Sequence, residues 1–286
     1  MTLNGTSRIL GPLALAVLVA AAAAPAAQAA LWPDHVALAE EWVFDPYINV
    51  DNNLWGSGSL VWRDGAGDLH ADVKCGSFTA QLLVQAYPGV ITGTVLTALT
   101  TSNSPYADQW YTAINTQKQD NAPGGSGIGF TKRSTVAAIQ AGDLLASAYT
   151  TSGDTGHMMT VKGIVLKTAG TTLPAGKTIA GVGAVNKYEV GVYDATNSPH
   201  GAYTSNPAPD TRYKRFNPNG TSYYIDDTGI GAGTIVIYEE VSTGRIVAWA
   251  WNVSPTTTSY YYAVTPNSDS TKYRPMAAGY LSGPGL

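Results

Sequence analysis

The spacing of apolar residues changes near Ile139, and this change constrains the fold more than any other feature of the 286-residue sequence. Before it, apolar residues recur at three- and four-residue steps, and Phe78, Leu82 and Ala86 would bury one stripe of a helix. After it, segments such as 157–166 alternate with period two, as half-buried strands do. Helices followed by antiparallel strands predict an α+β domain, with N-terminal helices packed on an antiparallel sheet.

The expected elements follow from this change of period. Helices are expected at 33–44, 75–86 and 104–118, and strands at 139–146, 157–166, 188–194, 233–241 and 245–253. The segment 45–72, which is rich in Gly, Asn and Asp, is interpreted as a connection. The run from Gly229 to Gly233 is interpreted as a flexible turn before a strand.

Residues 1–30 have the pattern of a secretory signal peptide. Arg8 supplies a short positive region, residues 13–24 an apolar run, and Ala29 ends a small-x-small cleavage site. We therefore expect a secreted protein, exported by a bacterium, in which residues 31–286 form a single domain. No later segment has about 18 consecutive apolar residues, so no membrane span is expected after cleavage.

Charge and cysteine content narrow the possible partners. The chain has 16 basic and 20 acidic residues, a net charge of −4, and no block of lysine or arginine. This composition argues against nucleic acid and anionic membranes as partners. The single cysteine, Cys75, excludes an internal disulfide. It also leaves an oxidisable thiol in an exported protein, a liability that a structural position could avoid with Ala or Ser.

Cys75 is expected in the first turn of its helix or just before it. Unpaired backbone N–H groups and the positive end of the helix dipole favour a thiolate there, and a thiolate can attack a carbonyl. A free cysteine is also often a buried space-filling residue. The catalytic interpretation therefore requires a histidine and an orienting group elsewhere in the chain.

His157 and Asp194 are the candidates for these two groups. His157 begins a predicted strand after Gly156, and Asp194 ends the next one. In acyl transfer through a thiolate, the imidazole takes and returns the proton while the carboxylate orients the imidazole. If the two strands pair, both side chains can emerge at the same end of the sheet and face Cys75.

Three motifs resemble those of the NlpC-type papain-like cysteine hydrolases, a superfamily of bacterial cell-wall endopeptidases and amidases. They are D-x-x-C-G-S-F at 72–78, I-x-x-G-D-L-L at 139–145 and G-H-M-x-x-V at 156–161. They are similar to the family's Asp-Cys-Ser-Gly-Phe, Pro-Gly-Asp-Leu and Gly-His-Val. The resemblance implies a papain-like α+β fold, Cys75 as nucleophile, His157 as general base, and a peptide or peptidoglycan peptide as substrate. No cofactor and no metal are expected.

The sequence departs from the family pattern at several positions. The order of residues 76–77 is inverted, and Lys74 stands where the family has an aspartate. The distance from the histidine to Asp194 is longer than usual, so Asn197 is kept as an alternative third residue. The backbone N–H of Cys75 can supply one oxyanion donor, while the second is unassigned.

Two other chemistries use the same residues. Transglutaminase-like acyl transferases share the order Cys, His, Asp, but their cysteine-to-histidine separation is normally shorter than the 82 residues found here. A zinc site could be built from His157, Asp194 and His200, although no tight metal-ligand spacing supports it. His200 follows Pro199 and is otherwise interpreted as a turn residue.

A third alternative is an exported binding module without catalysis. Trp249, Trp251 and the tyrosines 260–262 could stack on sugar rings. Trp249 and Trp251 share a strand face with Val247, so they are interpreted first as core or interface residues. Under this alternative Cys75 and His157 would be dispensable.

Overall fold

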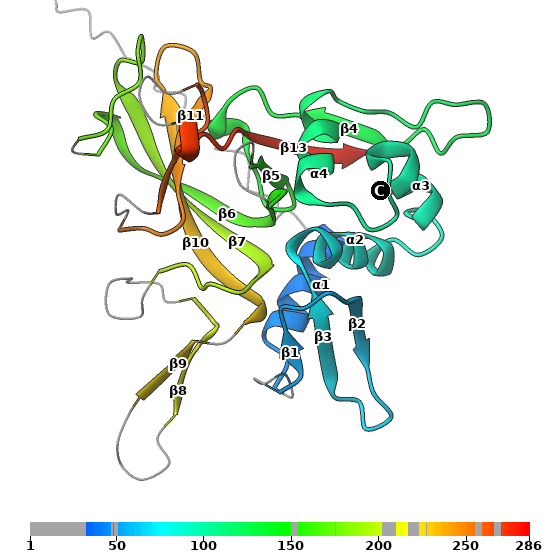
Figure 1. The fold of residues 1–286 in the computed structure, drawn as a ribbon. Helices are drawn as coiled ribbons and strands as arrows, with labels where there is room; N and C mark the ends of the chain where they lie inside the picture. Colours follow the sequence, from blue (N-terminus) through cyan, green and yellow to red (C-terminus); the bar gives the residue numbers. More distant parts are fainter. Residues whose placement is uncertain are drawn as a thin grey trace, which may run out of the picture. The chain divides into compact units, whose positions relative to one another are not determined.

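An eight-stranded antiparallel sheet dominates the structure, which is a computed structural model (Figure 1). The structure describes residues 33–46, 48, 51–149, 154–174, 176–201, 210–216, 223–226, 228–254, 259–265 and 270–286. The strand order is β12-β11-β10-β7-β6-β5-β13-β4, and every neighbouring pair is antiparallel. The strands are β4 (Gly129–Lys132), β5 (Leu144–Ala148), β6 (Gly156–Thr171), β7 (Val185–Thr196), β10 (Gly229–Glu240), β11 (Ile246–Ala250), β12 (Tyr260–Tyr262) and β13 (Met276–Ser282).

A second, three-stranded sheet lies where the sequence predicted a connection. It consists of β1 (Asn53–Leu54), β2 (Ser59–Arg63) and β3 (Leu69–Val73), in the order β1-β3-β2. In β3, Leu69, Ala71 and Val73 are buried while the residues between them are half-buried. This alternation has the period of a strand, so the prediction of a connection over 45–72 was wrong. A further hairpin joins β8 (Tyr213–Phe216) and β9 (Tyr223–Asp226).

The helices are few and short. The described residues form four α-helices, α1 (Asp34–Val43), α2 (Cys75–Ala86), α3 (Gly93–Thr100) and α4 (Ala107–Asn115), and two short 3-10 helices, η1 (Val136–Ala138) and η2 (Ser270–Lys272). None of these helices is long and apolar enough to cross a membrane. The predicted α+β papain-like fold, with helices packed on a sheet, is wrong because the structure is mostly β. Strands already begin before α2, and all eight strands of the large sheet follow it in the chain.

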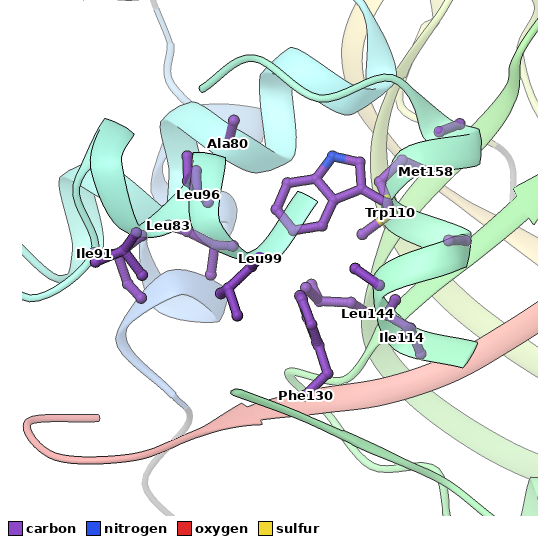
Figure 2. Close-up of a cluster of buried hydrophobic side chains, with 14 of the residues drawn as sticks. Ala80, Leu83, Ile91, Leu96, Leu99, Trp110, Ile114, Phe130, Leu144 and Met158 are labelled. Atoms are coloured by element: carbon purple, nitrogen blue, oxygen red, sulfur yellow. The ribbon is translucent and has the colours of Figure 1, made fainter. Parts of the chain in front are cut away.

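Buried apolar side chains hold α2 from two directions. One cluster, shown in Figure 2, joins Leu83 of α2 to Trp110 of α4 and Met158 of β6. A second cluster joins Phe78 and Leu82, both fully buried on α2, to side chains of α1, β3 and β7. Removal of this apolar area from water contributes about 25 cal/mol per Å² to stability. The helix that begins at Cys75 is therefore fixed between β3 and the large sheet.

The strands that carry the predicted histidine and aspartate are neighbours. β6 and β7 pair with Thr160 opposite Tyr193, which confirms the expected pairing and brings His157 and Asp194 to the same end of the two strands. On the other side of β7, β10 pairs in a register that sets Gly231 opposite Asp194. Residues 229–233 therefore belong to a strand, and their interpretation as a flexible turn was wrong.

The predicted signal peptide, residues 1–30, lies outside the described residues. Its assignment, the boundary at residue 31 and the export of the protein stay predictions.

Candidate active site

Cys75 is the first residue of α2, as the sequence predicted. The chain leaves β3 at Val73, and Lys74 has an extended backbone (φ −97°, ψ 168°) that turns it into the helix. Ser77 fixes this turn, because its hydroxyl accepts a hydrogen bond from the Lys74 N–H (3.0 Å) and donates one to the Lys74 carbonyl (3.1 Å). Cys75 is half-buried. Its backbone N–H belongs to the first turn, whose N–H groups have no partner within the helix.

His157, near the start of β6, links Cys75 to Asp194. Its Nε2 lies 2.5 Å from Asp194 Oδ2, and Cys75 is close enough to the ring to raise the pKa of the imidazole. Since Nε2 is engaged by the carboxylate, Nδ1 is the nitrogen left for the sulfur. The structure thus brings the three predicted site residues into one chain of contacts.

The pKa of His157 is raised from 6.5 to about 9. Burial alone would lower this pKa, because the charged imidazolium is poorly solvated inside the protein. The negative charge of Cys75, hydrogen bonds to Asp194 and Cys75, and the charge of Asp194 together outweigh burial. The imidazole is therefore held in its charged form by the two groups with which it would share a catalytic proton.

Asp194 is fully buried and ionised. Burial would raise the pKa of this carboxyl group, but the charges of Arg212 and His200 and the hydrogen bonds from His157 and His200 hold it well below the usual value. A buried carboxylate needs such partners, because an unpaired charge in the interior is strongly unfavourable. Asn197, the alternative third residue, is exposed at the cleft instead of contacting the ring.

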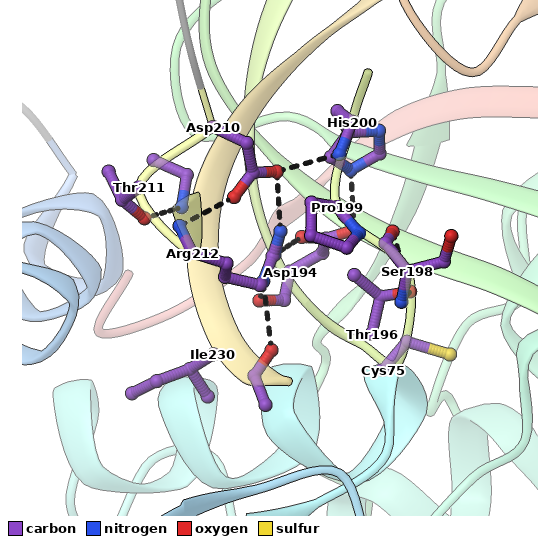
Figure 3. A network of polar contacts seen from close by, with 12 residues as sticks. Cys75, Asp194, Thr196, Ser198, Pro199, His200, Asp210, Thr211, Arg212 and Ile230 are labelled. Carbon is purple, nitrogen blue, oxygen red and sulfur yellow. Dashed lines mark hydrogen bonds and ion pairs between the residues drawn. The ribbon is translucent and has the colours of Figure 1, made fainter. Parts of the chain in front are cut away.

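Arg212 bridges two carboxylates behind the candidate site. Figure 3 shows it between Asp194 and Asp210, with the Cys75 sulfur near the same network. Its Nη1 donates to Asp210 Oδ2 (2.6 Å), and its Nη2 donates to the side-chain and backbone oxygens of Asp194. The Nε group donates to the Gly229 carbonyl (3.1 Å). Arg212 is 1% exposed, so this is an interior ion pair network.

His200 completes the network with two hydrogen bonds. Its Nε2 lies 2.8 Å from Asp194 Oδ2 and its Nδ1 lies 2.9 Å from the Trp251 carbonyl oxygen. Its backbone N–H also donates to Asp210 Oδ2 at 2.9 Å, so His200 contacts both carboxylates that Arg212 bridges. These hydrogen bonds and the guanidinium make the burial of the two carboxylates tolerable.

Sequence reasoning missed Asp210 and Arg212 and interpreted His200 as a turn residue. A signal was present in the alternating glycines of β10. A Cβ on Gly231 would lie 2.6 Å from Arg212 Nε, and a Cβ on Gly233 would lie 2.4 Å from His200 Cδ2. Glycine at every second position of a strand leaves one face open for large side chains. The pattern therefore marks the place where the network is buried.

The three residues of the alternative zinc site also lie close together in the structure. Ligand atoms of His157, Asp194 and His200 all lie within 4.8 Å of one another. However, both histidine Nε2 atoms point at the same Asp194 oxygen at hydrogen-bonding distance, and Arg212 occupies the other oxygen. A cationic guanidinium on the shared carboxylate disfavours a divalent cation at this place. The arrangement fits a hydrogen-bonded network better than a metal centre.

Trp251 shields the imidazoles from one direction. Its ring stacks on His200 with centroids 4.2 Å apart and meets His157 edge-on at 4.7 Å. Trp249 is fully buried in the core, as the interpretation of it as a core residue predicted, while Trp251 lines the cleft. An apolar ring beside the His157–Asp194 hydrogen bond limits competition from water.

Cys75 and His157 open onto a cleft of about 790 Å³. It is lined by Trp55, residues 57–59, 74–77 and 104–107, Tyr149, residues 154–157 and 196–198, Trp251, Tyr261 and Arg274. These segments come from the three-stranded sheet, the starts of α2 and α4, and the large sheet. The cleft has the volume of a site for a small molecule or a short peptide.

Comparison with known proteins shows a distant relative. Over 157 residues the chain is 27% identical to an uncharacterized protein of Acanthamoeba polyphaga mimivirus, and the match covers 54% of this chain and 57% of that protein. The chain thus spans little more than half the length of this relative. No protein-family model matches the chain, and no solved structure matches it.

Proposed function

We propose that this protein is a cysteine hydrolase that cleaves an amide bond through a thioester on Cys75. The observation that carries the proposal is the chain of contacts from the thiol to His157 and from His157 to a buried, ionised Asp194. These three groups supply a nucleophile, a proton carrier and an orienting charge. The motif resemblance to NlpC-type hydrolases supports the same class of chemistry, although it gives no support for the fold.

In the proposed reaction, the Cys75 sulfur attacks the amide carbonyl and forms a C–S bond. The backbone N–H groups at the start of α2, including that of Cys75, are placed to stabilise the oxyanion. His157 gives its proton to the leaving amine as the C–N bond breaks. It then removes a proton from the water that hydrolyses the thioester, and the free thiolate is restored.

A peptide or peptidoglycan peptide is the proposed substrate class, and secretion is the proposed localisation. Both rest on the motif resemblance and on the N-terminal sequence. The half-buried thiol and the size of the cleft are compatible with an extended peptide chain. Purified cell wall and a set of fluorogenic peptides are therefore the first substrates to test. Incorporation of a primary amine in place of water would instead indicate an acyl transferase.

Alkylation by iodoacetamide tests the reactive centre directly. Cys75 is the single cysteine, so every carbamidomethyl group found by intact mass spectrometry reports on it. We expect rapid labelling at pH 6, and labelling slowed at least about tenfold in His157→Ala, because the imidazolium that favours the thiolate is lost. His70→Ala is the matched control, since His70 pairs with Asp64 away from the cleft and should label like wild type. Slow labelling that is equal in all three proteins would falsify the proposal.

The pH dependence has a definite sign. His157 has a raised pKa, so the stability that its protonation provides is complete below 6.5 and is lost as the pH rises through about 9. The proton that His157 returns to the leaving amine disappears over the same range. We therefore expect turnover and thermal stability to fall together toward pH 9, as measured by peptide hydrolysis and by melting curves. In Cys75→Ser the pKa of His157 should be lower, which NMR titration of the ring can show.

A further inference from the structure

Among the arginines whose side chains are described, Arg274 is the one with no acidic partner in the described part of the chain. Of the arginines whose side chains are described, four form salt bridges with Asp or Glu: Arg63, Arg133, Arg212 and Arg245. The guanidinium of Arg274 forms no ion pair and no hydrogen bond with the described part of the chain, and the bond from Trp249 reaches only its backbone carbonyl. It nevertheless lines the same cleft as Cys75 and His157.

Two tyrosines hold the guanidinium in place. Its central carbon lies 3.7 Å from the ring centroid of Tyr149 and 3.8 Å from that of Tyr261. These distances are those of cation–π stacking, which is stronger when the cation is partly shielded from water. Stacking uses the faces of the guanidinium and leaves the N–H groups along its edges available. The side chain is thus positioned without using its hydrogen-bond donors.

The backbone around Arg274 is fixed as well. Its N–H donates to the Tyr262 carbonyl of β12 at 2.8 Å, and its own carbonyl accepts a hydrogen bond from Trp249 Nε1 at 3.0 Å. Tyr149 follows β5 directly, and the neighbouring Ala148 N–H donates to the Pro275 carbonyl. A guanidinium that contacts two rings and whose backbone is fixed loses little conformational freedom when a ligand binds.

The charges of Arg274 and Cys75 act on the same tyrosine. Burial raises the pKa of Tyr149, the charge of Arg274 lowers it, and the charge of Cys75 raises it. Arg274 and the thiol are therefore both within electrostatic reach of this hydroxyl. Among the described residues that line the cleft, the ionisable groups other than tyrosines, Cys75 and His157 are Lys74, Asp154 and Arg274 itself.

We infer that Arg274 is a carboxylate-binding residue of the cleft, and that the substrate carries a carboxylate near its scissile amide. A planar guanidinium with free edges matches a carboxylate by two parallel N–H···O hydrogen bonds. The carboxylate is the C-terminal group of a short peptide or an acidic side chain. This inference rests on the proposed hydrolase function, because the amide is attacked by Cys75 in the same cleft.

Matched thiol probes test the inference. The rate of Cys75 labelling by 3-maleimidopropionate is compared with that by 3-maleimidopropionamide, which has the same shape and no charge. In wild type we expect the anionic probe to react faster. In Arg274→Gln the ratio of anionic to neutral rates should fall at least about tenfold, because a charge-assisted pair of hydrogen bonds is lost. Arg274→Lys should retain part of the preference for the anionic probe, because the positive charge is kept.

Lys272→Gln is the matched control. Lys272 also lies over Tyr261, with its Nζ 5.3 Å from the ring centroid, but it does not line the cleft. This variant removes one positive charge from the same neighbourhood and should keep the wild-type ratio. If the ratio of anionic to neutral labelling rates fell equally in Lys272→Gln and Arg274→Gln, the effect would be one of general charge. That result would overturn the assignment of carboxylate binding to Arg274.

A second measurement needs no variant: it compares how well three ligands protect Cys75 of the wild-type protein from alkylation. N-acetyl-alanyl-alanine, with a terminal carboxylate, and N-acetyl-glutamyl amide, with a side-chain carboxylate, are compared with neutral N-acetyl-alanyl-alaninamide for slowing iodoacetamide labelling. At least one acid should protect several-fold better than the neutral compound, and the better acid identifies the source of the carboxylate. Equal protection by all three, with labelling of Cys75 still fast, would overturn the carboxylate site alone. Sluggish labelling by every probe would overturn the hydrolase proposal and this inference together.

Discussion

Asp143 and Asp194 are both buried carboxylates held by an arginine, yet their surroundings differ. Asp143 accepts two hydrogen bonds from Arg133, at 2.7 and 2.8 Å, and a third from the Gln140 N–H. These partners close the turn that leads into β5. Asp194 is also held by an arginine, but its second oxygen faces two histidine rings.

The difference shows which feature identifies a reactive site. Burial and an arginine partner are common to both centres, so neither feature alone indicates catalysis. At Asp143 every hydrogen bond serves the local backbone or its own arginine. At Asp194 one hydrogen bond reaches His157, and through that ring it reaches a half-buried thiol at the cleft. Contact with a group that can exchange a proton is the distinguishing feature.

The largest expected effect is on stability, from removal of the two arginines. Arg212→Met removes the guanidinium that buried Asp194 and Asp210 share and should lower the free energy of unfolding by about 3–5 kcal/mol. Arg133→Met should cost about 1–3 kcal/mol, because the side chain of Arg133 is 20% exposed and the ion pair is therefore partly solvated on the arginine side. Urea denaturation measures both. Equal losses would remove the distinction between a sealed and a solvent-accessible ion pair.

A second pair of variants separates chemistry from structure. Asp194→Asn weakens the interactions that raise the pKa of His157, so less imidazolium is present and Cys75 should be alkylated at least about tenfold more slowly at pH 6. Asp143→Asn changes only a turn and should leave the labelling rate of the folded protein within about twofold. Circular dichroism establishes that both variants are folded before the rates are compared. Slowing of the same size in both variants would contradict a special role for Asp194.

The last prediction concerns the loss of stability expected when a side chain is added at Gly231, which packs against Arg212. In Gly231→Ala the new methyl group would lie within 2.8 Å of three Arg212 atoms, which overpacks the network and should cost about 1–3 kcal/mol. Gly163→Ala on β6 is the matched control, because a Cβ there meets nothing within 4 Å. That substitution should change stability by less than about 1 kcal/mol and can be stabilising. Thermal melting distinguishes them, and a tolerated alanine at position 231 would argue that Arg212 moves freely.

Local patterns in the sequence were sufficient to predict those parts of the candidate site that lie on helices and strands. The start of the helix at Cys75, the strand at His157 and the strand at Asp194 were predicted from residue spacing and turn residues. Pairing of the two strands was also predicted, because consecutive antiparallel strands usually lie side by side. The fold class was wrong, since β2 and β3 were hidden in a segment whose glycines and polar residues resemble a loop.

The sequence by itself determined where the chain would form a helix or strand around the thiol and the imidazole, because these periodicities depend on neighbours a few residues apart. Only the tertiary structure decided which charged groups surround them. Asp210 and Arg212 are buried as an ion pair that also holds Asp194, His200 is hydrogen-bonded to both carboxylates, and two tyrosines distant in the sequence stack on Arg274 at the cleft. Such partners are separated by up to 125 residues, and no local pattern encodes a charge balance that exists only after the strands have paired.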